Sequence, residues 1–171
     1  SFASKPEKIR YDVAYERSQN ALSRLSRDAQ QAGVAIGIEN VWNRFLLSPL
    51  ETRRFLDEIG SDYVGMYLDV GNVIYTGYPE QWIELLAGRI KKLHMSDYRF
   101  DQAGIGAFVD LFAGDVDFPA VAEAIAKIGY DDYLTLEMLP NYKQFPEVSL
   151  YADKYAMNKI TELVAQAKAA L

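Results

Sequence analysis

Four ionisable side chains occur where short apolar runs give way to polar loops, and their types suit a divalent metal ion. They are Glu39, Asp69, His94 and Glu137, and His94 is the only histidine among the 171 residues. Carboxylates that face one cavity repel each other, so without a cation some would stay protonated at a cost in stability. Oxygen ligands with one imidazole suit Mn²⁺, Mg²⁺ or Co²⁺, and they admit Zn²⁺. A single strand-end carboxylate would most simply be a cap or an ion-pair partner, but the four together predict a metal site.

These side chains need a scaffold that brings strand ends together, and the hydrophobic pattern predicts one. Short apolar runs predict strands over 34–39, 64–69, 89–95 and 132–137. The first run is apolar at nearly every position, which is typical of a strand covered on both faces. Apolar residues at three- and four-residue spacing predict a helix before the first strand and after each strand. This alternation predicts a parallel sheet with right-handed crossovers.

Local signals mark where the helices begin and where function would lie. Ser48 is a predicted N-cap, because Pro49 follows it and Glu51 stands three residues later. Gly33 suits the end of the first helix. The longest irregular stretch is 97–117, and a loop of this length in a compact domain is more often functional than idle.

A (β/α)8 TIM barrel explains the convergence of the four side chains better than a doubly wound sheet. A doubly wound sheet would place a glycine-rich turn after its first strand, where this chain has Glu39-Asn40-Val41-Trp42. A barrel instead arranges strand-end side chains around one mouth, but it needs eight strands and ~250 residues. We therefore interpret residues 1–171 as a single α/β domain that supplies the C-terminal half of a barrel, strands five to eight with their helices. The N-terminal half is expected to be absent, or replaced by a second copy, because an open sheet would leave two unpaired edges.

Five short motifs, in chain order, resemble those of the xylose isomerase-like TIM barrels. They are Gly37-Ile38-Glu39-Asn40, Tyr67-Leu68-Asp69-Val70-Gly71-Asn72, Lys92-Leu93-His94-Met95-Ser96-Asp97, Gly114-Asp115-Val116-Asp117-Phe118 and Leu134-Thr135-Leu136-Glu137-Met138. This family includes sugar isomerases and epimerases related to tagatose 3-epimerase and ribulose-phosphate 3-epimerase. The resemblance implies that Glu39, Asp69, His94 and Glu137 are metal ligands, with Mn²⁺ as the first choice. It also implies that Glu39 and Glu137 double as an acid/base pair, one on each face of the substrate.

The activity implied by the resemblance is metal-dependent isomerisation or epimerisation of a sugar or sugar phosphate. One glutamate would remove the proton beside a ketose carbonyl to give an enediolate, and the other would return a proton. Asn72, Arg99 and Trp42 are expected to contact the substrate, with Phe45 adding to an apolar wall. Asn72 stands where many epimerases have a histidine, and its amide can bond a hydroxyl but cannot shuttle protons. Arg99 is shifted by about one residue from the arginine that the family uses.

Composition limits the partners and leaves two further functions open. A net charge of −6 disfavours nucleic acid, no run reaches the ~20 apolar residues of a membrane span, and the absence of cysteine excludes thiolate metal sites. We expect a cytoplasmic protein that binds a small sugar, with homo-oligomerisation open. A metal-dependent dehydratase of a polyol or of dehydroshikimate would use the same ligands. A non-catalytic, sugar-binding barrel fragment also stays open, whereas a three-zinc apurinic endonuclease would need several histidines and a basic groove.

Overall fold

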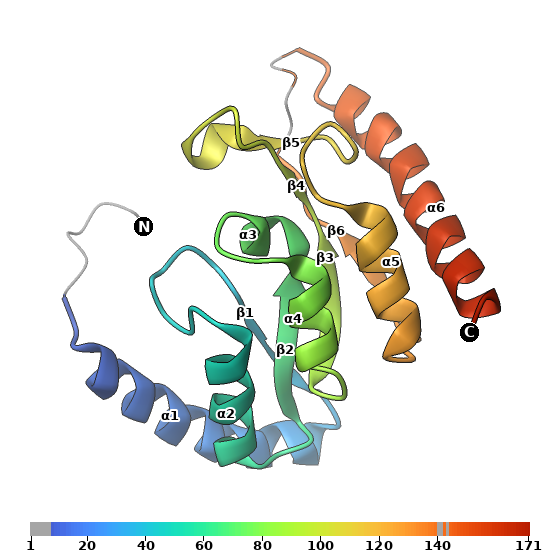
Figure 1. Ribbon diagram of the computed structural model, residues 1–171. Coiled ribbons are helices and arrows are strands. Elements are labelled where there is room, and N and C mark those ends of the chain that lie inside the picture. The colour runs from blue at the N-terminus through green and yellow to red at the C-terminus, as the bar shows by residue number, and fades with distance from the viewer. Residues whose placement is uncertain (1–7, 140–141, 143) are drawn as a thin grey trace.

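A parallel β-sheet with helices packed along it forms the computed structural model, which describes residues 8–139, 142 and 144–171 (Figure 1). The sheet contains β1 (Ile36–Glu39), β2 (Val64–Asp69), β3 (Ile90–Met95) and β6 (Leu134–Leu136), in the spatial order β1-β2-β3-β6. The main helices are α1 (Tyr11–Ala32), α2 (Pro49–Ile59), α4 (Pro79–Leu85), α5 (Phe118–Lys127) and α6 (Glu147–Ala169). Helix α2 packs against α4, α4 against α5, and α5 against α6. The predicted alternation and the parallel sheet are confirmed, and β1 and β6 form its edges.

The two faces of the central strands differ sharply in burial. Leu68, Leu93 and Met95 are fully buried in the hydrophobic core. Side chains alternate between faces along a strand, so the intervening Tyr67 and His94 point to the opposite face, where both are only partly buried. One face of the sheet therefore builds the core with the helices, and the other leads to the candidate site.

The outer strands are shorter than predicted, and the interpretation of the first as covered on both faces is wrong. Val34 is 63% exposed and lies outside β1. Its N–H donates to Ala29 O in the turn that ends α1 at Gly33, which has the left-handed φ of 66° that glycine favours. Tyr133 is 80% exposed and likewise precedes β6, because its N–H donates to the Asp132 carboxylate in the connecting turn.

Helix α2 begins as predicted, whereas the short helix α3 (Val70–Ile74) was missed. The Ser48 hydroxyl accepts a hydrogen bond from the N–H of Glu51, with Pro49 in the first turn. Asp69 caps α3 in the same way, since its carboxylate accepts from the N–H of Asn72 at 2.6 Å. Helix propensity does not predict a helix of five residues directly after a buried strand. The signal that was present is Asp69, the last residue of β2, which is the N-cap of α3.

The stretch 97–117 is folded rather than irregular. It contains the antiparallel pair β4 (Asp97–Tyr98) and β5 (Phe108–Val109), with the 3₁₀ helix η1 (Gly104–Ala107) between them. Asp97 is 1% exposed, and its carboxylate accepts hydrogen bonds from the N–H groups of Tyr98, Gly114 and Val116 at 2.9–3.1 Å. A side chain at position 114 would overlap the Asp97 carboxylate, so glycine is required there. Asp97 therefore joins both ends of this segment.

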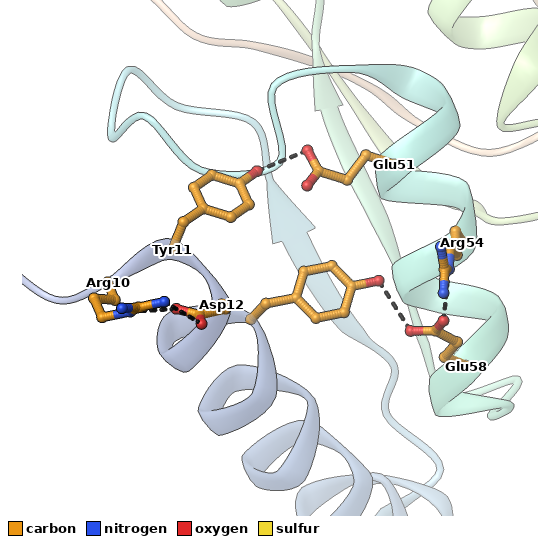
Figure 2. Close-up of a pocket in the computed structure, with 7 residues that line it drawn as sticks. Arg10, Tyr11, Asp12, Glu51, Arg54 and Glu58 are labelled. Carbon is orange, nitrogen blue, oxygen red and sulfur yellow. Dashed lines mark hydrogen bonds and ion pairs between the residues drawn. The ribbon is translucent and has the colours of Figure 1, made fainter.

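Polar side chains connect α1 to α2, and Figure 2 shows them around a cavity between these helices. The Tyr11 hydroxyl donates to Glu51 at 2.7 Å, and the Tyr15 hydroxyl donates to Glu58 at 2.9 Å. Arg54 forms an ion pair with the same Glu58 at 2.7 Å. Burial, followed by the bond to Glu58, raises the pKa of Tyr15 to about 12. Within the described ranges, no helix combines the length and the apolar character needed to cross a membrane.

Candidate metal and substrate site

The structure brings the four predicted metal-binding side chains to one point at the carboxyl end of the sheet. Glu39, Asp69 and His94 come from β1, β2 and β3, and Glu137 directly follows β6. One potential ligand atom from each residue lies within 4.8 Å of the others. The His94 Nδ1 atom lies 2.9 Å from Glu39 Oε1, 3.1 Å from Glu137 Oε2 and 3.9 Å from Asp69 Oδ2. The parallel register, which pairs Asp69 with His94, explains why residues so far apart in sequence converge.

Asp69 is the most deeply placed member of this cluster. Its side chain is fully buried, and Oδ1 accepts hydrogen bonds from the Asn72 N–H and the Ser96 hydroxyl at 2.6 and 2.8 Å. Its Oδ2 atom accepts none from the residues that the structure describes. Burial raises the pKa of Asp69 to about 8, and the nearby Glu137 contributes to the rise. A buried acceptor without a donor costs about 1–3 kcal/mol, and a cation bound between these groups would relieve that cost.

Three residues around the cluster were not predicted from the sequence. The Asn40 side chain brackets the backbone of Asp69, donating to its carbonyl and accepting from its N–H, both at 2.9 Å. The Ser96 hydroxyl holds the Asp69 carboxylate, and the Tyr67 ring lies against the His94 ring with centroids 3.9 Å apart. Asn40 directly follows one ligand and Ser96 follows another by two residues, so a search for polar neighbours would have found both. Tyr67 carries no such signal, because its contact depends on the register of β2 and β3.

A cavity of about 230 Å³ lies beside the cluster. Its polar lining residues are Glu39, Asn72, Ser96, Asp97 and Glu137. Its apolar lining residues are Val41, Ile105, Phe108, Val109, Met138 and Leu139. Of the four clustered residues, Glu39 and Glu137 line this cavity, whereas Asp69 and His94 do not. A small molecule in the cavity would meet Glu39 and Glu137 together with residues of the folded 97–117 segment.

Of the three predicted substrate-binding residues, only Asn72 lines the cavity. Trp42 instead contacts two residues of the lining: its Nε1 donates to the Asn72 carbonyl at 3.2 Å, and its ring centroid lies 5.3 Å from that of Phe108. The structure does not bring Arg99 to the cavity lining, because its guanidinium forms two hydrogen bonds with Asp101. The substrate contacts of Trp42 and Arg99 stay predictions.

Two other aromatic residues, Phe45 and Trp82, have structural partners. Phe45 packs its ring against those of Tyr15 and Phe55 instead of lining this cavity. Trp82 is 5% exposed and belongs to the hydrophobic core.

Comparison with known proteins assigns the family. Residues 2–156 match the family described as xylose isomerase-like TIM barrel. The chain belongs to this xylose isomerase-like family. The resemblance of its five short motifs is thereby confirmed, and a parallel sheet with packed helices is the architecture that a TIM barrel requires.

Curated relatives of this xylose isomerase-like chain include an epimerase and a dehydratase. The L-ribulose 3-epimerase of Mesorhizobium japonicum is 30% identical over 128 residues, which are 72% of this chain and 40% of that protein. The inosose dehydratase of Lacticaseibacillus casei is 27% identical over 141 residues, which are 74% of this chain and 47% of that protein. The chain therefore spans less than half the length of these curated relatives.

Solved structures agree on the fold. A structure of L-ribulose 3-epimerase matches with a TM-score of 0.74 at 24% identity, covering 97% of this chain and 59% of that one. The IOLI protein, solved with a bound zinc atom, matches with a TM-score of 0.78 at 20% identity, covering 95% and 60%. The four-stranded sheet is consistent with the predicted C-terminal half of an eight-stranded xylose isomerase-like barrel.

Proposed function

We propose that the complete protein is a metal-dependent sugar isomerase or epimerase that moves a proton on the carbon beside a ketose carbonyl. The observation that carries this proposal is the convergence of Glu39, Asp69, His94 and Glu137 within 4.8 Å, next to a cavity that both glutamates line. Membership of the xylose isomerase-like family supports it, and so does the similarity to an L-ribulose 3-epimerase.

The four clustered residues would hold one divalent ion, with Mn²⁺ as the first choice and Co²⁺, Mg²⁺ or Zn²⁺ as alternatives. Their donor set fits such an ion, because three carboxylates and one imidazole supply mostly hard oxygen ligands. The buried Asp69 Oδ2 has no hydrogen-bond donor among the described residues, which suits a ligand atom. When bound, a divalent ion polarises a carbonyl oxygen and so eases removal of the proton beside it.

Glu39 and Glu137 are the groups that we assign to proton transfer. They approach the cavity from the two edge strands of the sheet, and their side chains are 32% and 51% exposed, so both can reach a substrate. One removes the proton beside the carbonyl to give an enediolate, and the other returns a proton. Return on the opposite face gives an epimer, and return to the neighbouring carbon gives the aldose. Asn72, on the same cavity, would bond a hydroxyl and hold the sugar in place.

Dehydration of a polyol ketone is the second candidate function, because the inosose dehydratase of Lacticaseibacillus casei is also similar to this chain. The same pair of carboxylates would serve, one removing the proton beside the carbonyl and the other protonating a departing hydroxyl. A sugar-binding protein without catalysis is a third possibility. The cytoplasmic location expected from the sequence stays a prediction, and homo-oligomerisation stays open.

Exchange with deuterated water tests all three possibilities at once. The complete gene product is stripped of metal, reloaded with Mn²⁺, and incubated with a panel of ketoses, ketose phosphates and inosose. Epimerisation or isomerisation places deuterium on the carbon beside the carbonyl, and dehydration produces a dehydrated ketone that NMR resolves. Chelation should abolish turnover and Mn²⁺ should restore it. Turnover that persists in metal-free protein would refute the metal, and no reaction with any sugar would refute the enzyme.

A further inference from the structure

The two oxygens of the Asp69 carboxylate lie in different surroundings. Oδ1 accepts two hydrogen bonds, from the Asn72 N–H at 2.6 Å and from the Ser96 hydroxyl at 2.8 Å. Oδ2 accepts none from the residues that the structure describes, and it is the oxygen that lies 3.9 Å from His94 Nδ1. The carboxylate is therefore turned so that one oxygen is held by protein donors and the other faces a second member of the cluster.

The backbone of Asp69 is fixed independently of its side chain. The Asn40 amide group donates to the Asp69 carbonyl, and the Asn40 side-chain oxygen accepts from the Asp69 N–H, both at 2.9 Å. These two bonds lie just beyond Glu39 and Tyr67, the last paired residues of β1 and β2. With the main chain fixed, the main freedom left to the carboxylate is rotation about its Cβ–Cγ bond, a torsion that is broad and roughly two-fold.

Ser96 is placed to remove that rotational freedom. It is buried directly after β3, whereas the second donor, the Asn72 N–H, belongs to the first turn of α3. Gly71 of the same turn leaves room for the hydroxyl, since a Cβ at position 71 would overlap Ser96 Oγ. A serine hydroxyl has a single hydrogen to donate, and here Asp69 receives it. Although Ser96 lines the cavity, its donor is thus directed at a clustered carboxylate.

We propose that Ser96 is a positioning residue for the metal site, which keeps Asp69 a one-oxygen ligand with Oδ2 directed toward the ion. The inference rests on the proposed function, because it takes the four clustered residues as metal ligands. Two hydrogen bonds on Oδ1 prevent the carboxylate from rotating, so Oδ2 is in place before an ion arrives. Removal of a group that orients a metal ligand typically lowers metal affinity by ~10–100-fold.

Binding of Mn²⁺ to the complete, metal-free protein, measured by calorimetry without any sugar, provides the first test. Ser96→Ala should raise the Kd for Mn²⁺ by ~10-fold or more. Ser96→Thr keeps the hydroxyl and should recover most of that loss. Ser26→Ala is the matched control, because Ser26 is also buried but its hydroxyl donates to the Ser23 carbonyl within α1. This control should bind Mn²⁺ like the wild type.

Gly71→Ala tests the same contact without changing Ser96. Its added methyl group would displace the Ser96 hydroxyl from its present position, so the Kd for Mn²⁺ should rise in this variant as well. Gly106→Ala, whose added Cβ has no atom within 4 Å, should leave the Kd unchanged. The glycine pair keeps the inference testable if Ser96→Ala does not fold.

The visible spectrum of bound Co²⁺ separates positioning from a purely structural role, because the bands depend on the number and geometry of the ligand atoms. In Ser96→Ala the Asp69 carboxylate can turn, so the bands should shift at full occupancy, whereas Ser26→Ala should keep the wild-type spectrum. A purely structural role would lower the free energy of unfolding and leave the bands unchanged.

The outcomes distinguish this inference from the proposed function. Wild-type affinity for Mn²⁺ and an unchanged Co²⁺ spectrum in folded Ser96→Ala overturn the inference and leave the proposed function standing. A loss of affinity that Ser96→Thr does not recover also overturns it, since the hydroxyl would not be the cause. A wild-type protein that binds no Mn²⁺, like Asp69→Ala, overturns both the inference and the metal-dependent function.

Discussion

Asp97 is the residue whose replacement tests most directly how the cavity wall is held. Its Oδ1 atom accepts hydrogen bonds from the Tyr98 and Val116 N–H groups at 2.9 and 3.1 Å, and Oδ2 accepts from Gly114 at 2.9 Å. Asp97→Ala removes both acceptor oxygens and leaves three N–H donors unpaired in a site where the residue is 1% exposed. Each buried donor left unpaired costs about 1–3 kcal/mol. We therefore expect the free energy of unfolding to fall by roughly 3–6 kcal/mol after partial relaxation.

Asp97→Asn separates the loss of hydrogen bonds from the loss of charge. The amide oxygen of Asn can still accept from Tyr98 and Val116, while its NH₂ group faces the Gly114 donor. Burial raises the pKa of Asp97, and the backbone donors oppose that rise, so a neutral side chain is tolerated electrostatically. Asp97→Asn should thus cost about 1–3 kcal/mol, the value of one unpaired donor.

Urea unfolding of the complete protein, followed by circular dichroism, measures both losses. Asp101→Ala is the control, because Asp101 belongs to the same segment but forms an exposed pair with Arg99 that is worth about 0–1 kcal/mol. Asp97→Ala should also raise KM for sugar, since the segment carries Ile105 and Phe108 to the cavity. Unfolding of Asp97→Ala at the wild-type urea concentration would show that the three hydrogen bonds do not hold the segment.

Three further outcomes are expected. Glu39→Gln and Glu137→Gln should each lower kcat by ~10² or more, the scale of one general acid or base. Gly71→Ala should cost about 1–3 kcal/mol, because the new methyl group overlaps the Ser96 hydroxyl and backbone. Tyr15→Phe should reduce the loss of stability at alkaline pH. Burial raises the pKa of Tyr15 from 10 in the unfolded chain to about 12 in the folded protein. The protonated hydroxyl therefore stabilises the fold below pH 10, and this contribution is lost between pH 10 and 12.

Each outcome has a matched control and a contradicting result. Glu123→Gln, on the exposed side of α5, should leave kcat unchanged, and metal occupancy must match in every glutamate variant before turnover is compared. Gly106→Ala is the control for Gly71, since nothing lies within 4 Å of its added Cβ; equal stability of the two variants would contradict the close contact. Tyr151→Phe, at a 73% exposed position, controls for Tyr15, and parallel pH profiles of the two variants would rule out a special role for Tyr15.

The ligand cluster was predictable from sequence because it depends only on the order in which strands and their terminal polar residues follow one another along the chain. Parallel strands end at one edge, so polar residues that end successive apolar runs must meet, and Glu39, Asp69 and His94 did so. Their supporting contacts depend on register and rotamer instead. The register between β2 and β3 shifts between Met66 and Tyr67, and the Tyr67 ring contacts the His94 ring in the resulting pairing. No local sequence pattern predicts this shift.

The fold of the 97–117 segment, in contrast, was not predictable from sequence. Its glycines and its lack of periodicity indicated a loop, yet one buried carboxylate organises it into β4, β5 and η1. Those hydrogen bonds join residues 17 and 19 positions apart, a range at which propensity carries no information. The sequence places Arg99 and Asp101 two residues apart, but it does not show that their side chains pair, and the contact of Arg99 with a substrate stays a prediction.

The chain contains two tryptophans, and their unequal surroundings give the protein an intrinsic optical reporter. Trp82 is 5% exposed in the core, whereas Trp42 is 44% exposed, touches Phe108 and bonds the Asn72 carbonyl. Phe108 and Asn72 both line the cavity, so a sugar that displaces its water changes the polarity sensed by the Trp42 indole. Trp82 is buried and does not line this cavity, so its emission should stay constant during the titration. Titration of fluorescence can therefore follow occupancy of the cavity without any attached dye, and the signal should vanish in Trp42→Phe.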